Sequence, residues 1–388
     1  MQKFISANWI FPVTEPAMPN GVLEIDGEGK ILQVLTQIEA RSKGVTNIEF
    51  FEGALVPGFV NTHCHLELSH LYGKIPERTG LPAFVKEIVA QRTASDEVVL
   101  KAMELADEQM YTNGIVAIGD ISNQLISKYI KQKSKLYYHT FVEVFGFNRP
   151  SKPIINDAID LRNDFLPLKS SIVPHAPYSV SADLLKSIAI HTREIDLLSI
   201  HNQETAAENE FFEVGTGDFD LMYQRLNIPK SEIHGNGKNS LNYHLPKLPK
   251  NVNTLLVHNT FSSKADVDFA KNKHQKLFWC LCPNANLYIE NNLPDVDLLS
   301  SENVKLTLGT DSLASNHQLS ILSEMKTLQE HKNVAFEDLL KWATLNGAEF
   351  LDIDDQYGSF KVGKMPGILN IDLDSTFKIL NKKVKRVI

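Results

Sequence analysis

Two histidines that are two residues apart, His63 and His65, end an apolar run and would form half of a metal site. Side chains two residues apart on a β-strand project from the same side, so both imidazoles would point in one direction. Neutral imidazoles are frequent ligands of divalent metal ions. Such a pair also occurs as hydrogen-bonding residues in protein cores, so its meaning depends on ligand-type residues elsewhere in the chain.

Three further apolar runs lead into residues that bind metals or transfer protons. His201 ends one run and is followed by Glu204, His258 ends a second, and Asp311 follows a third. In a parallel sheet the carboxyl ends of the strands meet at one edge. The spacing therefore predicts that these side chains share one site with the histidine pair.

The elements that would position these residues alternate between short β-type runs and longer amphipathic stretches, a pattern typical of βα units. We predict eight strands, at 54–60, 115–120, 136–144, 171–174, 197–201, 254–258, 276–281 and 305–309, and helices that include 82–92, 98–111, 182–194, 264–273, 318–330 and 336–350. Eight such units predict an α/β fold of the (β/α)8 TIM barrel type, with its functional residues at the carboxyl ends of the strands. Residues 205–248 lack a clean period, which predicts an extended loop region near the barrel mouth.

Both ends of the chain have a different character, with short β-type runs and turn residues. We expect these ends to pair in one small β-sandwich. The expected domains are thus 1–53 with 354–388 as the β-sandwich, and 54–353 as the barrel.

Composition restricts the partners of this 388-residue chain. Lys and Arg number 39 against 47 Asp and Glu, a net charge of -8, so nucleic acid is not expected as a partner. No stretch approaches the ~18 consecutive apolar residues of a membrane span, and the N-terminus does not have the pattern of a signal peptide. Three cysteines indicate a reducing compartment, so we expect a cytoplasmic protein acting on a small molecule. Exposed barrel helices commonly pair, so a homodimer is one expected assembly.

Six motifs resemble those of the amidohydrolase superfamily, specifically its cytosine, guanine and S-adenosylhomocysteine deaminases and its triazine chlorohydrolases. In the order of the family they are PGFVNTHCH at 57–65, PHAPYS at 174–179, HNQE at 201–204, HN at 258–259, CPNAN at 282–286 and GTDS at 309–312. The segment 358–364 resembles the family's return into its β-sandwich. The chain departs from the family's usual Ala-Asp-Leu continuation at 365–369, which concerns the sandwich and leaves the site motifs intact.

The resemblance implies that His63, His65, His201 and Asp311 bind one metal ion. Many members of the superfamily hold two metals bridged by a modified lysine, but the run 171–178 contains no Lys, which favours a single ion. Three neutral imidazoles and one carboxylate leave a divalent ion with net positive charge, which lowers the pKa of bound water toward about 7. The donor set suits zinc and would also accept iron(II).

The resemblance also implies roles in proton transfer and substrate binding. Glu204 would shuttle protons, His258 would orient water or substrate, and Asp311 would take the proton of the attacking water. Glu204 must then be protonated for part of the cycle; the alternative is an ordinary solvated loop carboxylate. His175 resembles a substrate-contacting histidine, and its alternative role is to hold the turn at 174–177. Glu67, which follows the histidine pair, would point to the pocket or cap a nearby segment.

The expected reaction is the hydrolytic deamination of an aromatic heterocycle, such as a purine, a pyrimidine or a nucleoside derivative. A chlorohydrolase or a cyclic-amide hydrolase would use the same site. A barrel that has lost catalysis and serves as an assembly module is a further alternative, which metal content would distinguish. Substrate choice would depend on the segments 71–79, 145–150 and 205–248.

Overall fold

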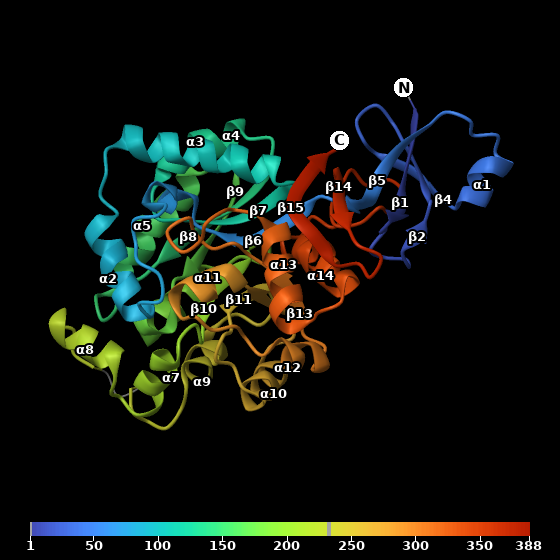
Figure 1. The fold of residues 1–388 in the computed structure, drawn as a ribbon. Helices are drawn as coiled ribbons and strands as arrows, with labels where there is room; N and C mark the ends of the chain where they lie inside the picture. The colour runs from blue at the N-terminus through green and yellow to red at the C-terminus, as the bar shows by residue number, and fades with distance from the viewer. Residues whose placement is uncertain (1, 231–233) are drawn as a thin grey trace.

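Eight parallel strands form two four-stranded sheets in the larger part of the molecule, which is an α/β protein (Figure 1). The computed structural model describes residues 2–230 and 234–388. The sheet orders are β6-β7-β8-β9 and β10-β11-β12-β13. These strands are β6 (Phe59–Cys64), β7 (Ile115–Ser122), β8 (Tyr137–Val144), β9 (Lys169–Pro174), β10 (Leu198–Asn202), β11 (Thr254–His258), β12 (Leu277–Leu281) and β13 (Lys305–Leu308). Nearly all of their residues are buried, as expected where helices cover a parallel sheet.

The two sheets adjoin at both of their outer strands. At the end of β9 and β10, the backbone N–H of His201 donates to the carbonyl oxygen of His175 at 3.0 Å. At the other junction, the N–H groups of Thr310 and Asp311 both donate to the carbonyl oxygen of His63, each at 3.1 Å. These bonds bring the carboxyl ends of β6, β10 and β13 to the same end of the two sheets.

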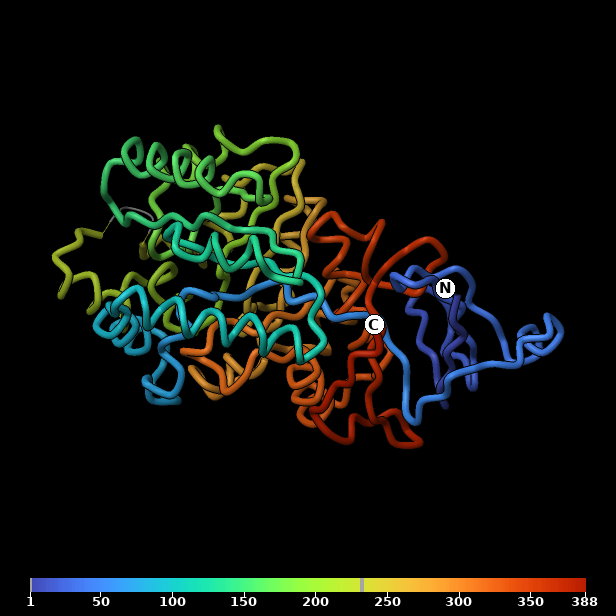
Figure 2. The backbone as a smooth tube through the Cα atoms, turned by 90° about the horizontal axis from the view of Figure 1, so that it is seen from above, coloured from blue at the N-terminus to red at the C-terminus, as the bar shows by residue number. Residues whose placement is uncertain are grey.

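A third sheet contains seven strands from both ends of the chain, and Figures 1 and 2 show both termini in this part of the molecule. Its order is β15-β14-β5-β1-β3-β4, with β2 paired to β1. Its strands are β1 (Lys3–Ile10), β2 (Met18–Pro19), β3 (Val22–Ile25), β4 (Ile31–Leu35), β5 (Ile48–Pro57), β14 (Ile368–Leu373) and β15 (Ile379–Arg386). Strand β5 lies between β1, to which it is parallel, and β14, to which it is antiparallel.

The predicted first barrel strand, 54–60, is wrong in its position. Residues 54–57 belong to β5 of the third sheet, and the strand that carries the histidine pair is β6, which begins at Phe59. Gly58 lies between the two strands, where a Cβ atom would be only 2.2 Å from Cγ1 of Val116 and 2.6 Å from the carbonyl oxygen of Pro366. The chain therefore changes sheets within one continuous apolar run, which the sequence pattern does not reveal. The other seven predicted strands lie within two residues of the observed bounds.

Helices cover the sheets, and those predicted from amphipathic periodicity are present. They are α1 (Gln37–Ser42), α2 (Leu81–Gln91), α3 (Asp96–Thr112), α4 (Lys128–Lys133), α5 (Ser151–Asp164), α6 (Ala182–His191), α10 (Lys264–Lys273), α11 (Pro283–Ile289), α12 (Val296–Ser301), α13 (Ile321–Lys332), α14 (Phe336–Ala343) and α15 (Leu345–Phe350), with 3-10 turns η1 (Leu66–Leu71), η2 (Leu125–Ser127) and η3 (Pro177–Ser179). The predicted helix 336–350 is divided at Thr344, whose φ of -133° and ψ of -82° are not helical. Within the described residues, no helix is long and apolar enough to cross a bilayer.

The predicted extended loop at 205–248 is wrong for most of its length, although 231–233 lie outside the described residues. It contains α7 (Ala206–Glu213), α8 (Asp218–Arg225), α9 (Ser240–His244) and the 3-10 turn η4 (Leu245–Lys247). Helices of five to eight residues span too few turns to show a clear period. Capping residues were the available signal, because the side chains of Thr205 and Asn239 accept from the backbone N–H groups of Ala207 and Asn242.

A buried ion pair supports the segment that follows His65. Nζ of Lys131 lies 2.6 Å from Oδ2 of Asp120, and neither side chain is exposed. Lys131 also donates to the hydroxyls of Ser122 at 2.8 Å and Thr140 at 3.1 Å. Oδ1 of Asp120 accepts from the backbone N–H of Leu66 at 2.8 Å, so the pair holds the first residue of η1, directly after His65.

Replacing Lys131 by Met leaves the carboxylate of Asp120 buried without its cation. We expect the free energy of unfolding to fall by about 3–5 kcal/mol, the usual result of removing one partner of a buried pair. Urea denaturation followed by circular dichroism measures the change. The matched control is Lys101→Met, which removes an exposed ion pair with Glu104 and should change stability by less than about 1 kcal/mol. Equal midpoints for the two variants would contradict this role of Lys131.

Candidate metal centre and active site

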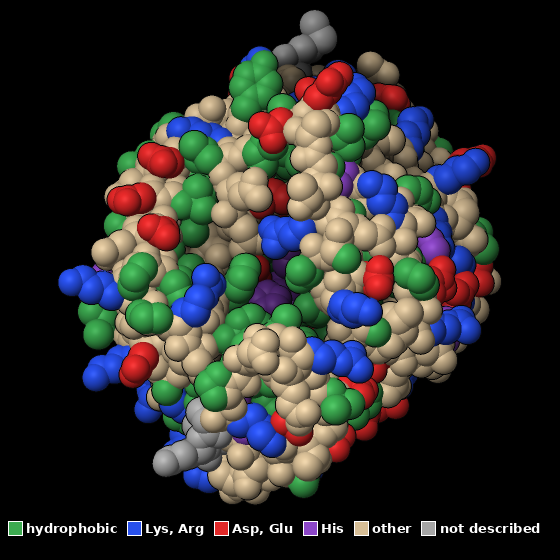
Figure 3. Space-filling model, turned by 90° about the vertical axis from the view of Figure 1, so that its left-hand side faces the viewer, with side chains coloured by type: hydrophobic (Ala, Val, Ile, Leu, Met, Phe, Trp, Pro, Cys, Tyr) green, Lys and Arg blue, Asp and Glu red, His purple; other side chains and the backbone are tan. Residues whose placement is uncertain are grey.

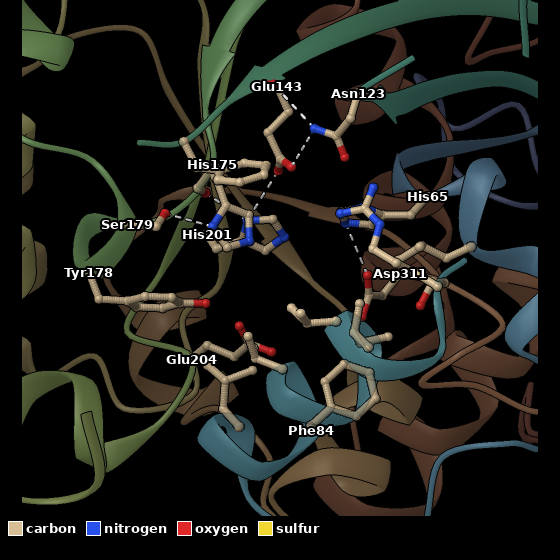
Figure 4. Close-up of a pocket in the computed structure, with 18 of the residues that line it drawn as sticks. His65, Phe84, Asn123, Glu143, His175, Tyr178, Ser179, His201, Glu204 and Asp311 are labelled. Atoms are coloured by element: carbon tan, nitrogen blue, oxygen red, sulfur yellow. Dashed lines mark hydrogen bonds and ion pairs between the residues drawn. The ribbon is translucent and has the colours of Figure 1, made fainter. Parts of the chain in front are cut away.

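The four predicted metal ligands lie together at the carboxyl ends of the strands, and Figure 4 shows three of them, His65, His201 and Asp311. Nε2 of His63 and Nε2 of His65 are 3.1 Å apart, and both lie near Oδ1 of Asp311, at 3.6 and 3.3 Å respectively. His201 offers a ring nitrogen within 4.8 Å of the ligand atoms of the other two histidines. His63 lies in β6 and His65 directly after it, His201 lies in β10, and Asp311 follows β13 after a two-residue turn.

The chemistry of this donor set fits a divalent cation. A tetrahedral ion with bonds of about 2.0–2.1 Å places its ligand atoms roughly 3.3 Å apart, close to the spacings of His63, His65 and Asp311. Burial lowers the pKa of His65 to about 3 and that of His201 well below its usual value, so both rings are neutral. Burial alone would raise the pKa of Asp311, but hydrogen bonding to His63 and the neighbouring imidazoles lower it, so this carboxylate is ionised.

Other side chains and backbone groups orient the ligands. Nδ1 of His201 donates to the carbonyl oxygen of His175 at 2.7 Å, which leaves Nε2 as the ligand atom. Oδ2 of Asp311 accepts from the hydroxyl of Ser315 at 2.6 Å, which leaves Oδ1 toward the histidines. Ser315 was not identified from the sequence, because one serine four residues beyond an aspartate carries no distinctive signal.

A second group, Glu143, His175 and His201, also brings ligand-type atoms within 4.8 Å of one another. It shares His201 with the first group. Because Nδ1 of this ring is already hydrogen-bonded to the backbone, only Nε2 remains for an ion. The two groups therefore compete for one ring nitrogen, which favours a single ion.

Glu204 and His258 face the same cavity as the ligands. Oε1 of Glu204 lies 3.6 Å from Nε2 of His258, and Nδ1 of His258 pairs with Oδ1 of Asn286 at 2.9 Å. Burial raises the pKa of Glu204 well above its usual value, and the negative charges of Asp311 and two other glutamates add to this rise. Glu204 is thus a buried carboxyl group whose environment favours its protonated form, unlike the solvated carboxylate of the alternative expectation.

His175 combines the two roles considered from the sequence. Its ring lines the cavity, and its Nδ1 is 2.7 Å from Oγ of Ser179, whose hydroxyl donates to the carbonyl oxygen of Ala176 at 3.0 Å. The serine oxygen therefore accepts from Nδ1–H, and Nε2 keeps a free lone pair. Burial lowers the pKa of His175 to about 4, so the ring is neutral.

The cavity has a volume of about 170 Å³ and combines the polar side chains described above with apolar walls. Figure 3 shows a hollow with histidine side chains at its floor, bordered by hydrophobic, acidic and basic side chains. Apolar walls come from α2, η1, α8 and the segment after β8, and they comprise Leu68, Leu81, Phe84, Val85, Ile88, Val89, Phe145, Phe147 and Met222. Such walls suit a flat organic ring and keep water away from the polar groups.

Glu143 is a residue of the cavity that the sequence analysis missed. It lies near the end of β8, and its Oε2 accepts from Nδ2 of Asn123 at 3.2 Å. Its Oε1 is buried and has no hydrogen-bond partner within the part of the chain that the structure describes. The carboxylate near the end of a β-type run was the available signal, the same kind that identified Asp311.

Glu67 does not line this cavity. Its carboxylate accepts from the backbone N–H groups of Asn123 at 3.0 Å and Gln124 at 3.3 Å, so it caps the segment after β7. Of the two roles considered for Glu67, the structure thus shows the capping role. By fixing the backbone of Asn123, it also supports the side chain that bonds Glu143.

Known proteins are similar to this chain in sequence and in fold. An adenosine deaminase of Helicobacter pylori is 27% identical over 319 residues, which cover 79% of this chain and 76% of that protein. The solved structure of aminofutalosine deaminase from Helicobacter pylori, in complex with methylthio-coformycin, has a TM-score of 0.83 at 22% identity and covers 98% of this chain and 94% of its own. Atrazine chlorohydrolase from Arthrobacter aurescens TC1, complexed with zinc, has a TM-score of 0.74 at 16% identity, with 98% and 92% covered.

The family model of the amidohydrolases matches residues 54–388, which is most of the chain. The matched region contains all eight strands of the two parallel sheets and every residue of the site described above. The resemblance inferred from the six motifs is therefore confirmed, and the chain belongs to the amidohydrolase family.

Proposed function

We propose that this protein is a metal-dependent aminohydrolase that deaminates a purine nucleoside and releases ammonia. The observation that carries the proposal is the convergence of His63, His65 and Asp311, with His201 beside them, next to the buried Glu204, whose pKa burial raises. The deaminase names of the similar proteins support the reaction class and the purine substrate.

His63, His65, His201 and Asp311 would hold one divalent ion, zinc or alternatively iron(II). Zinc is favoured because the donor set suits it and because a protein of the same fold was solved with zinc. When bound, such an ion makes water a nucleophile near neutral pH. Two features favour one ion over two. The run 171–178 has no lysine that could bridge two ions, and the two possible ligand groups share one nitrogen of His201.

The chain's own groups divide the proton transfers. Glu204 holds a proton in the cavity and gives it to a ring nitrogen of the substrate, so that the carbon bearing the amino group becomes electrophilic. Asp311 accepts a proton from the attacking water, and His258 orients this water through Nε2 while Asn286 fixes its other nitrogen. The amino group then leaves as ammonia after it receives the proton that Asp311 took from water, and Glu204 takes back a proton from the new hydroxyl group as this becomes the carbonyl of the product.

A halide substrate on the same site is the second candidate, because atrazine chlorohydrolase shares the fold. Chloride leaves without a proton, whereas an amine needs one. The names of the similar deaminases therefore favour an amine over chloride as the leaving group. Cyclic-amide hydrolysis needs the same proton, but the similar deaminases favour the exocyclic amine.

We also propose that residues 54–353 close as a (β/α)8 barrel and that 1–53 with 354–388 form the companion β domain. The bonds between β9 and β10 and between β13 and β6 support closure, and the third sheet supports a domain built from both ends. Strand β5 connects the two domains through residues 54–57. The cytoplasm is the proposed compartment.

Replacing His201 by Ala removes one of the four proposed metal ligands. We expect the purified variant to lose most of its metal and its turnover, which metal analysis after gel filtration and ammonia release measure. His317→Ala is the control, because this histidine is exposed and outside the site. Full metal occupancy in the His201 variant would refute its role as a ligand.

Replacing Glu204 by Gln removes the proton donor and leaves the metal ligands unchanged. We expect normal metal content and a fall in kcat on adenosine of at least ~100-fold, the usual scale of general acid-base catalysis. Glu210→Gln, a change in the adjoining helix α7 away from the cavity, is the matched control. A rate close to normal in the Glu204 variant would exclude the proposed shuttle.

Replacing Glu143 by Leu tests whether its unpartnered oxygen accepts from the ribose hydroxyls. In this variant Nδ2 of Asn123 can still donate to the backbone carbonyl oxygen of residue 143, a bond of 3.1 Å, so we expect this part of the cavity wall to keep its position. Because a hydrogen bond to a charged group contributes about 1.5–3 kcal/mol, we expect the kcat/KM ratio of adenosine to 2′,3′-dideoxyadenosine to fall about tenfold. If kcat/KM falls equally for both nucleosides, Glu143 does not bind the ribose hydroxyls.

A further inference from the structure

Glu208 is a buried carboxyl group in the first turn of α7, and the proton transfers of the proposed reaction do not use it. It is 0% exposed and does not line the cavity. With the residues that the structure describes, it forms no ion pair. A carboxylate is costly to bury unless other groups compensate for the lost water. Its contacts therefore indicate what the protein gains from this residue.

The contacts of Glu208 are with the backbone that precedes the helix. Its Oε1 accepts from the N–H of Gln203 at 3.1 Å. Burial raises the pKa of Glu208 to about 7, and hydrogen bonds from the backbone at Gln203 and Glu204 are among the influences that oppose this rise. The carboxyl group thus faces the backbone at the point where the chain leaves β10 and reaches Glu204.

An exposed glutamate of the same chain shows how an ordinary helix cap differs. In α1, Glu39 stands at the third helical position, and its carboxylate accepts from the N–H of the N-cap residue, Thr36, at 2.7 Å. This arrangement is a capping box, and the bond from Thr36 lowers the pKa of Glu39. Glu208 stands at the same position of α7, but its carboxylate reaches past the N-cap residue Thr205 to Gln203. The longer reach joins the helix to the end of the strand.

Gln203 needs support because its backbone is left-handed. Its φ is 45°, in a region that residues with a Cβ atom seldom occupy. Its carbonyl oxygen accepts from the N–H of Phe261 at 3.0 Å, and its Oε1 accepts from the hydroxyl of Ser262 at 2.6 Å. Both partners lie in the segment that follows His258. The bond to Glu208 is the one that holds the N–H of this turn.

We propose that Glu208 is a positioning residue for Glu204: its carboxyl oxygen holds the left-handed turn at Gln203, and this turn directs the side chain of Glu204 into the cavity. This inference rests on the proposed deamination. Glu204 follows Gln203 directly, so a change of the backbone at Gln203 moves the whole carboxyl group. Oε1 of Glu204 lies 3.6 Å from Nε2 of His258, and a misplacement of about 1 Å at such a site can lower the rate about 100-fold. The role requires the length of the Glu208 side chain and one acceptor oxygen, and it does not require the charge.

Two substitutions separate the position of the acceptor oxygen from the charge. Glu208→Asp keeps a carboxylate but shortens the side chain by one methylene, so the oxygen withdraws from the N–H of Gln203. Glu208→Gln keeps the length and one acceptor oxygen but removes the charge. With metal-loaded protein and adenosine, we expect the Asp variant to lose at least ~10-fold in kcat, with KM within about threefold of its normal value and normal metal content. The Gln variant should keep kcat within about threefold of the wild-type value.

Glu39→Asp is the matched control, because it shortens the capping glutamate of α1, which follows β4 of the third sheet. It should leave kcat and KM unchanged. A Glu208→Asp variant with normal kcat, or with a raised KM and normal kcat, overturns the positioning role. A Glu208→Gln variant that loses as much kcat as the Asp variant also overturns it, because the charge would then matter more than the acceptor oxygen.

A second measurement separates this inference from the proposed function. Hydrogen–deuterium exchange followed by mass spectrometry reports the protection of the amides in 202–206 without any turnover. We expect this segment to exchange at least ~10-fold faster in Glu208→Asp and close to the wild-type rate in Glu208→Gln. If metal-loaded wild-type protein deaminates no nucleoside, the proposed function fails, and exchange still tests Glu208. Equal exchange in the wild-type protein and the Asp variant, or fast exchange in the Gln variant, overturns its role.

Discussion

The arrangement of the whole site depends on the junction between β13 and β6. There one carbonyl oxygen, that of His63, accepts from two successive N–H groups, those of Thr310 and Asp311. Asp311 has a φ of 55°, a left-handed conformation that aspartate adopts more readily than most residues. The shared carbonyl fixes where the strands end relative to each other, and the left-handed turn directs the carboxylate toward the imidazoles. A shift of one residue at this junction would separate the only anionic ligand from the histidines.

The histidines around this junction follow a common scheme. His201, His258 and His175 each use Nδ1 for a backbone carbonyl, an amide or a hydroxyl of the protein. The remaining nitrogen of each ring is then available to an ion, to water or to substrate. Their burial keeps all three rings neutral, so each offers a lone pair at physiological pH. All three rings thus keep their second nitrogen free. The position of each ring in the fold then decides whether this nitrogen faces an ion, water or substrate.

Much of the site was predictable from the sequence because each ligand follows its own β-type run. Features that depend on residues far away in the sequence were not predictable. The run 54–60 gave no sign that the chain changes sheets at Gly58, since both halves are equally apolar. Arg92 resembled an ordinary cation at a helix end, where the helix dipole favours one, and only the folded chain shows that it borders a cavity. Glu143 had a signal similar to that of Asp311, but one carboxylate inside a strand is ambiguous without its neighbours.

The pairing of β5 with β14 bears on how the chain assembles during synthesis. β5 runs through Gly58 into the strand of His63, but one of its edges is covered only by residues 368–371, more than 300 positions later. Until the ribosome has released that segment, this edge lacks its hydrogen-bonding neighbour. Contacts of such long sequence separation form slowly, so the strand that carries His63 reaches its final support only after residues 368–371 have been synthesised.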